Sequence, residues 1–214
     1  MKKFYFKRVK SLIIVCGFGL IGLGGAAYYI WSKMSVDQQP FYGTVLQQPR
    51  PLPAFSLEGT AGYPIDPQHL QGHWTFVFMG FTHCASICPI TLAELAKMMR
   101  GLAQRPDLAT PKVLMITLDP QRDNIVRMKD YVQSFHSDFI GARGTAENVH
   151  DLAKYFGIAY TQVNSNVQKH ANDYSIEHSG AIMLLNPHGD LVAFFTPPHR
   201  ADLLIQDYQR LQQR

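Results

Sequence analysis

Two cysteines, Cys84 and Cys88, lie between a segment with the pattern of a buried strand and a segment with the pattern of a helix. The preceding segment, 74–81, is a continuous run rich in β-branched and aromatic residues, as in strands buried on both faces. After the cysteines, Pro89 opens a helical pattern over 89–104, and proline is favoured in the first turn of a helix. We therefore expect Cys88 at or just before the helix start. There, backbone N–H groups and the positive end of the helix dipole lower the pKa of a thiol.

The rest of the chain alternates between strand and helix patterns. Strands are predicted over 54–57, 112–118, 181–185 and 191–195, and a short strand or turn over 139–142. Helices are predicted over 124–135, 145–157 and 200–211, and a loop or inserted hairpin over 158–176. The order predicts an α/β domain, a central mixed sheet flanked by helices. A dithiol between the first buried strand and the first long helix of such a unit indicates a thioredoxin-like fold.

The N-terminal part has a different composition. Residues 1–10 hold five of the 20 Lys and Arg residues, and residues 11–31 hold no charged residue. These 21 positions are enough to cross a hydrocarbon core of about 30 Å, so we expect an N-terminal transmembrane helix with a basic cytoplasmic tail. A cleaved signal peptide is the alternative, although the apolar run is long for one. The proline-rich segment 32–53 is predicted to be a linker, leaving 54–214 as one exported domain.

Charge and cysteine content narrow the function further. Outside the basic tail, 15 basic residues face 16 acidic ones, so the sequence gives no case for nucleic-acid binding. Cys16 falls in the apolar run and is interpreted as a small hydrophobic residue. The exported part then has two cysteines, and a disulfide closing so short a loop would constrain the unfolded chain only weakly. A reactive dithiol or a metal site is therefore favoured over a structural disulfide.

Two cysteines are few ligands for a retained metal, and a histidine is the natural third. His178 directly precedes the apolar run 181–185, and in a thioredoxin-like sheet the loop entering that strand borders the dithiol. His83 adjoins Cys84 and is a weaker candidate, because neighbouring side chains often point apart. The other histidines considered, expected at the surface or at a helix start, are His136, His150, His188 and His199. Five methionines fit core packing: Met79, Met98, Met99, Met115 and Met183.

Three stretches in this order resemble the Sco/SenC family of membrane-anchored, thioredoxin-fold copper proteins: 80–89 around the dithiol, 117–123, and Glu177-His178-Ser179. The resemblance implies copper ligation, as Cu(I) or Cu(II), by Cys84, Cys88 and His178. Two departures leave these ligands intact. Ala85-Ser86 replaces the family's Pro-Asp, and Glu177 replaces its usual Asp.

Asp119, Arg122 and Asp123 also match a family signature. Two interpretations of them stay open. One is a turn at the strand end with an ion pair, and the other is support of the metal ligands through contacts with them.

The resemblance implies a copper chaperone that delivers copper to the dinuclear copper centre (CuA) of cytochrome c oxidase during its assembly. Its partners would be the oxidase subunit carrying CuA, another copper chaperone and a thiol reductant. The expected location is the bacterial inner membrane with the domain in the periplasm, a mitochondrial inner membrane being the second choice. Whether the chain is also an enzyme stays open at this point.

Three other functions are considered. A thiol-disulfide oxidoreductase could use Cys84 and Cys88 to reduce the cysteines of the oxidase copper site or of another exported client. A cysteine peroxidase would need an activating arginine, which nothing in the sequence marks. A tethered domain with an incidental disulfide is the remaining alternative.

Overall fold

The computed structural model describes Gly25, residues 40–164 and residues 174–213. Residues from Phe41 onward form one compact unit. The predicted basic tail over 1–10 and, Gly25 apart, the predicted membrane anchor over 11–31 lie outside the described residues. In the part of the chain that is described, no helix has the length and apolarity needed to cross a bilayer.

A mixed eight-stranded sheet forms the centre of this unit, with strand order β1-β10-β9-β4-β5-β6-β2-β3. β4, β5 and β6 run parallel, and the remaining neighbours pair antiparallel. All residues of β4 and β9 are buried, as the continuous apolar runs predicted. The strands are β1 (Thr44–Arg50), β2 (Leu57–Gly59), β3 (Pro64–Ile65), β4 (Thr75–Gly80), β5 (Lys112–Thr117), β6 (Ile140–Arg143), β9 (Ile182–Leu185) and β10 (Leu191–Phe195).

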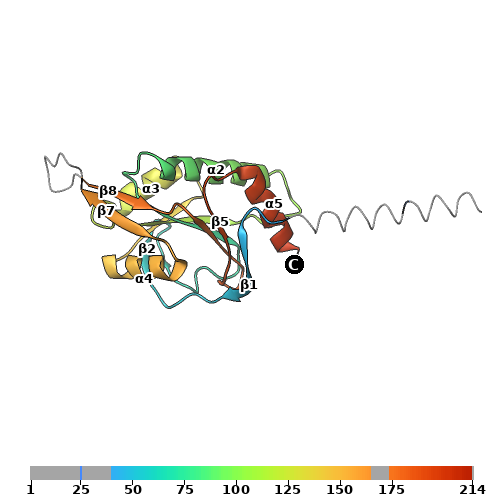
Figure 1. The fold of residues 1–214 in the computed structure, drawn as a ribbon, viewed down its shortest axis with the longest axis horizontal. Helices are drawn as coiled ribbons and strands as arrows, with labels where there is room; N and C mark the ends of the chain where they lie inside the picture. Colours follow the sequence, from blue (N-terminus) through green and yellow to red (C-terminus); the bar gives the residue numbers. More distant parts are fainter. Residues whose placement is uncertain (1–24, 26–39, 165–173, 214) are drawn as a thin grey trace, which may run out of the picture. The chain divides into compact units, whose positions relative to one another are not determined.

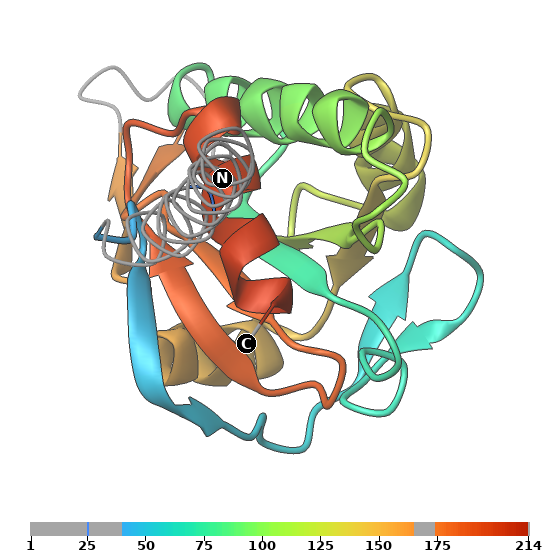
Figure 2. The ribbon, with the colours of Figure 1, turned by 90° about the vertical axis from the view of Figure 1, so that its right-hand side faces the viewer.

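Helices cover both faces of the sheet, so the predicted central mixed sheet flanked by helices is confirmed. Figure 1 shows α2 and α3 above the sheet and α4 below it. α5 lies beside α2 (Figure 2), where Arg105 donates a hydrogen bond to Gln209 at 2.7 Å. The helices are α2 (Ile87–Leu102), α3 (Ile125–Gln133), α4 (Ala146–Phe156) and α5 (Ala201–Gln212).

The ends of α4 carry residue types that helix ends favour. The Thr145 side chain caps α4 by accepting from the Asn148 amide, and Gly157 ends that helix with a φ of 69°. However, α2 begins at Ile87, two residues before the predicted start at Pro89. Pro89 is tolerated inside the first turn because the first four N–H groups of a helix have no intrahelical acceptor. Cys88 therefore lies within the first turn rather than before it.

Two segments differ from, or refine, the predicted arrangement. The linker predicted over 32–53 contains β1, which pairs with β10 at one edge of the sheet. β1 is mostly exposed and includes Pro49, as edge strands allow, so its polar sequence gave no strand signal. The segment after α4 forms the hairpin alternative, with β7 (Tyr160–Asn164) antiparallel to β8 (Tyr174–His178).

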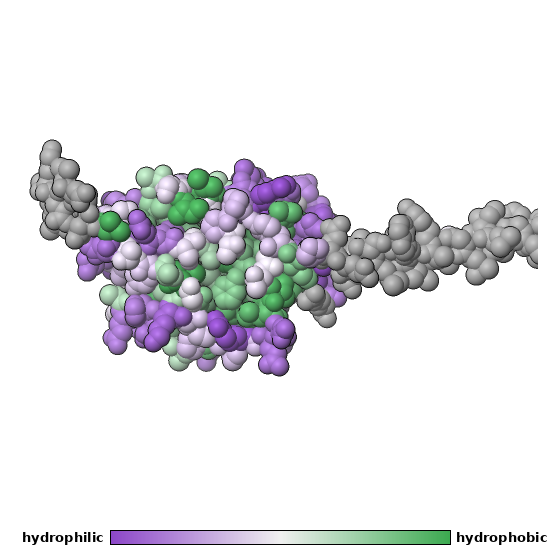
Figure 3. Space-filling view, in the orientation of Figure 1, coloured by the Kyte–Doolittle hydropathy of each residue, from purple (hydrophilic) through white to green (hydrophobic). Residues whose placement is uncertain are grey.

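The surface is mixed in polarity. On the face seen in Figure 3, apolar residues gather between the upper helices and α4, with hydrophilic residues bordering them. The core lies beneath, on both faces of the central strands, and contains the five methionines assigned to packing.

Gly80 is the last residue of β4, and side chains of the core fill the space beside its Cα atom. A Cβ atom there would lie 2.6 Å from Phe78 Cε1 and 2.8 Å from Cys88 Sγ. We predict that Gly80→Ala lowers the free energy of unfolding by about 1–3 kcal/mol, because these groups must shift. Denaturant unfolding of the metal-free protein measures this.

Gly101→Ala is the matched control. Its Cβ would meet Ile205 Cδ1, the end of a flexible side chain, at 2.6 Å, and alanine is favoured over glycine in a helix by up to about 1 kcal/mol. This variant is expected to unfold at a denaturant concentration near that of the wild type. Equal unfolding midpoints for Gly80→Ala and the wild type would contradict the crowding described at Gly80.

Candidate metal centre

The two cysteines lie on the turn that joins β4 to α2. The Gly80 carbonyl accepts from the Leu118 amide at 2.7 Å, which fixes the end of β4 beside the end of β5. The turn then closes as the Cys84 amide donates to the Phe81 carbonyl at 3.2 Å. Ser86, the N-cap residue, makes no side-chain cap. Instead Cys84 Sγ accepts from the Cys88 amide at 3.5 Å, so a sulfur occupies the place of a helix cap.

His178 reaches these sulfurs from a different element. It is the last residue of β8, and its Nε2 lies 3.3 Å from Cys88 Sγ. One donor atom each from Cys84, Cys88 and His178 lie within 4.8 Å of one another. Both cysteines are free thiols, Cys88 buried and Cys84 partly exposed. The structure therefore brings together the three residues that the family resemblance pointed to.

The two thiols share one proton unequally. The hydrogen bond from Cys88 is the main cause that lowers the pKa of Cys84 to about 3, with a smaller contribution from His178. The same interaction, followed by burial, raises the pKa of Cys88 well above its usual range. At neutral pH the pair is thus a partly exposed thiolate beside a buried thiol. A thiolate is both the nucleophile and the metal-binding form of cysteine.

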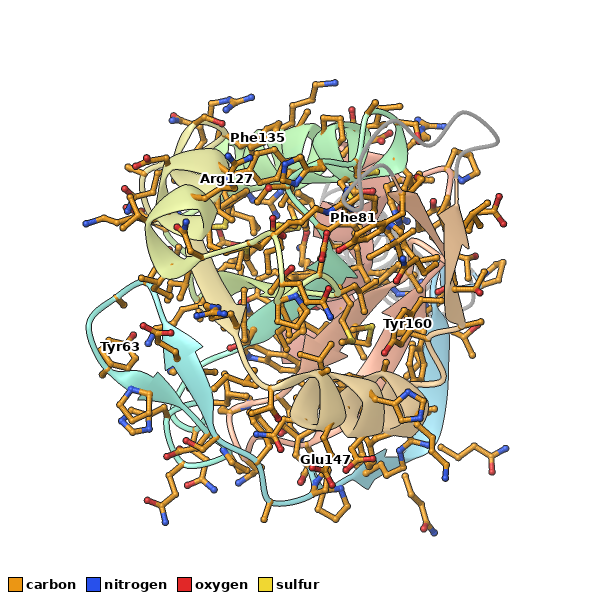
Figure 4. The ribbon with its side chains drawn as sticks, turned by 90° about the vertical axis from the view of Figure 1, so that its left-hand side faces the viewer. Tyr63, Phe81, Arg127, Phe135, Glu147 and Tyr160 are labelled. Carbon is orange, nitrogen blue, oxygen red and sulfur yellow. The ribbon has the colours of Figure 1, made fainter. Side chains whose placement is uncertain are left out.

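Aromatic rings surround the imidazole. The rings of Phe78 and Phe81 lie 5.9 and 6.0 Å from that of His178, measured between centroids. Figure 4 looks onto this end of the molecule and shows Phe81 between α3, marked by Arg127, and the β7–β8 hairpin, marked by Tyr160. His178 Nδ1 is buried, and no described residue forms a hydrogen bond with it. The other ring nitrogen, Nε2, is the one that faces the sulfurs.

The other histidines do not join this cluster. His83 is exposed, and its Nε2 accepts a hydrogen bond at 3.0 Å from Arg127 on α3. His150 and His188 are exposed, as predicted, and His136 is partly exposed. His199 was expected only to begin the last helix. It is 6% exposed and its Nε2 bonds the Gly180 carbonyl at 2.8 Å, beside the end of β8.

Two residues that the sequence did not mark contact the turn that contains Asp119 and Asp123. Thr82 donates to Asp123 through its amide at 3.0 Å and through its hydroxyl at 2.5 Å. Tyr174 donates its hydroxyl to Asp119 at 2.6 Å. Tyr174 and His178 lie four positions apart on β8 and so share a face of the strand, a signal that could have found it. Arg122 and Asp119 form the expected ion pair.

The chemistry of the donor set can be read from these contacts. Two sulfurs and one imidazole nitrogen suit a soft cation, because thiolates select Cu(I) or Zn(II) and imidazole accepts copper and zinc. Among the described residues, this is the one group of three Cys, His, Asp or Glu side chains whose donor atoms converge. The partly exposed Cys84 gives the group an accessible side.

Comparison with known proteins finds relatives of this chain. The chain is 33% identical over 156 residues to the mitochondrial protein SCO2 homolog of Mus musculus, covering 73% of this chain and 60% of that protein. It is 30% identical to a putative copper-binding protein of Stutzerimonas stutzeri, covering 74% of this chain and 75% of that protein.

Among solved structures, the crystal structure of Arabidopsis thaliana ScoI with copper bound superposes with a TM-score of 0.68 at 28% identity. The match covers 76% of this chain and 98% of that chain. The mixed α/β thioredoxin-like fold expected from the sequence is thereby confirmed. The family model described as SCO1/SenC matches residues 44–213, and the chain therefore belongs to the SCO1/SenC family.

Proposed function

We propose that this protein is a membrane-anchored copper chaperone that holds one copper ion between Cys84, Cys88 and His178. It would pass that ion to the CuA site of cytochrome c oxidase during oxidase assembly. The observation that carries the proposal is the convergence of these three donor atoms within 4.8 Å of one another. Family membership and the copper-containing Arabidopsis relative support copper as the metal.

The arrangement suits an ion that must be both held and released. The buried Cys88 and the partly exposed Cys84 would hold Cu(I) through sulfur, and His178 would add the nitrogen that makes Cu(II) tolerable. Because His178 comes from the hairpin and not from the dithiol turn, it can move away while both sulfurs keep their places. A partner's ligand could then enter on the side of Cys84.

The apolar segment 11–31 and the basic tail before it support a membrane anchor, with the domain in the periplasm of a bacterium. An exported copper domain held at the inner membrane would lie on the side where a CuA subunit receives its metal. The other partners we propose are a second copper chaperone as donor and a thiol reductant.

A thiol-disulfide oxidoreductase is the second candidate, favoured by the Cys84 thiolate beside the Cys88 thiol. Cys84 would attack a client disulfide and release one client thiolate. Cys88 would then attack the mixed disulfide and release the second, leaving a Cys84–Cys88 disulfide and a client reduced by two electrons. An exported thiol reductant would restore the dithiol. His178 forms no bond in this reaction and makes only the smaller contribution to the low pKa of Cys84.

The three metal ligands can be tested one at a time. Cys84→Ser, Cys88→Ser and His178→Ala should each lower copper affinity by about 100-fold or more, since each removes a direct ligand and losing even an outer contact lowers affinity by about 10–100-fold. The measurement is a copper titration of the full-length protein in competition with a chelator. His83→Ala is the matched control, because His83 adjoins Cys84 but its ring contacts Arg127 and, at 3.6 Å, Asp123 rather than the sulfurs. Wild-type affinity in all three ligand variants would refute the site assignment.

The same variants separate the two candidate functions. If the dithiol also acts as a reductase, His178→Ala should lose copper retention while still reducing a model disulfide at a rate close to that of the wild type. The reason is that the hydrogen bond from Cys88, the main cause of the low Cys84 pKa, remains. Loss of disulfide reduction in this variant would contradict the reaction written above.

A further prediction concerns the pH dependence of the dithiol. In the reduced, metal-free protein, the rate of Cys84 alkylation by iodoacetamide should be nearly constant from pH 5 to 8, because the pKa of Cys84 lies at about 3. Cys88→Ala removes the S–H donor, so the pKa of Cys84 should rise. The alkylation rate should then increase about tenfold per pH unit below an ordinary thiol pKa of about 8.5.

Cys88→Ser keeps a hydroxyl donor at the same position and is expected to give an intermediate profile. Mass spectrometry of the peptide containing both residues locates the modification. A flat profile in Cys88→Ala would show that the hydrogen bond from Cys88 does not hold Cys84 as a thiolate.

A further inference from the structure

The turn between β5 and α3, residues 119–123, sends two carboxylates to the two halves of the cysteine–histidine cluster. Asp123 is fully buried and accepts from the Thr82 amide, the Thr82 hydroxyl and, at 2.6 Å, the Thr117 hydroxyl. Thr82 lies two residues before Cys84. Asp123 therefore fixes the start of the dithiol turn against the end of β5.

Asp119 reaches the other half. It is 2% exposed and accepts at 2.6 Å from the hydroxyl of Tyr174 on β8. Arg122, paired with Asp119, places its guanidinium carbon 3.6 Å from the centroid of the Tyr174 ring and donates to the Tyr174 carbonyl at 2.8 Å. The hydroxyl, the ring and the backbone of one tyrosine are thus all held by the 119–123 turn.

This contact matters because the β7–β8 hairpin is not part of the main sheet. Within the described residues, β7 and β8 pair with each other and with no strand of the eight-stranded sheet. On the C-terminal side of His178, the chain is held at Gly180, whose carbonyl forms a hydrogen bond with His199 Nε2 at 2.8 Å. Tyr174 supplies the tie on the N-terminal side, four residues before His178 on the same face of β8.

We propose that Asp119 and Tyr174 are positioning residues for His178, while Asp123 and Thr82 position the dithiol. The two halves of the copper site would then be held by separate carboxylates of one turn. The proposal rests on the proposed function, because it assigns the cluster as a copper site. Its consequence is that the imidazole can be loosened while the two sulfurs stay in place.

The two copper oxidation states should respond differently to that loosening. Cu(I) would be held mainly by the two sulfurs, whereas Cu(II) would depend on the imidazole nitrogen. Tyr174→Phe removes the hydroxyl and leaves the ring under the Arg122 guanidinium. It should lower Cu(II) affinity by about 10–100-fold, as is typical when an outer contact of a ligand is lost, and weaken the nitrogen hyperfine coupling in the paramagnetic resonance spectrum. Cu(I) affinity should change far less.

Tyr160→Phe is the matched control. Tyr160 lies directly opposite His178 in the hairpin, but its hydroxyl faces the His150 ring at 3.5 Å and not the 119–123 turn. It should keep the wild-type Cu(II) spectrum and affinity. Asp119→Ala should lower Cu(II) affinity at least as much as Tyr174→Phe, because it removes the acceptor of the Tyr174 hydroxyl and also the ion pair with Arg122. The double variant should match Asp119→Ala alone, because the Tyr174 hydroxyl has already lost its acceptor.

A measurement on the metal-free protein separates this inference from the proposed function. Amide hydrogen exchange over 174–179 should be faster in Tyr174→Phe and unchanged in Tyr160→Phe, whether or not copper binds. If the wild type binds no copper but exchange is faster in Tyr174→Phe, only the copper function is overturned. Unchanged exchange, or an unchanged Cu(II) spectrum in a copper-binding wild type, would overturn the positioning role.

Discussion

The parallel pairing of β4 with β5 is the constraint on which the proposed site depends. Gly80 lies opposite Thr117 in this pair, so the chain leaves both strands at the same edge of the sheet. The dithiol turn follows β4 and the 119–123 turn follows β5, and the buried Asp123 bonds one to the other. A carboxylate in an apolar interior is stable only when its oxygens are bonded. The three donors on Asp123 therefore hold the two turns in one geometry.

The electrostatics of the pair follow from the same burial. Two adjacent thiolates repel each other, so one proton remains on the buried Cys88 and the negative charge stays on Cys84. A soft cation can replace that proton and neutralise both sulfurs, which links metal binding to proton release. The rings of Phe78 and Phe81 lie within 6.0 Å of the imidazole, measured between centroids, so apolar groups border the nitrogen donor.

Local patterns in the sequence predicted most of the fold. The apolar runs that became β4, β5 and β9, and the caps at Thr145 and Gly157, are signals contained in a few neighbouring residues. β1 was assigned to a linker because an exposed edge strand needs no apolar pattern. Likewise, the position of Cys88 inside α2 depends on a sulfur acting as the cap, which no cap rule for oxygen side chains anticipates.

The sequence pointed to the three donors of the proposed site and offered Asp119, Arg122 and Asp123 as supports of them, but it did not mark Tyr174 or Thr82. His178 could be selected because it stands directly before an apolar run and matches a family motif, although only the fold brings it to Cys88, 90 positions away. Tyr174 and Thr82 act through partners 55 and 41 positions distant, and neither carries a chemical group unusual enough to stand out alone. His199 was expected to begin the last helix, but it precedes Arg200, the N-cap of α5. Its buried bond to Gly180 depends on tertiary packing.

The crowding at Gly80 affects how metal binding is assigned to related sequences. Cys88 Sγ occupies space that any side chain at position 80 would need. The position of this sulfur therefore depends on the lack of a side chain at Gly80. A related sequence could keep both cysteines and the histidine yet lose the site through a larger residue at this position. The presence of the three donor residues is therefore a necessary but insufficient criterion for assigning metal binding to a relative, and the residue at the end of the strand should be read with them.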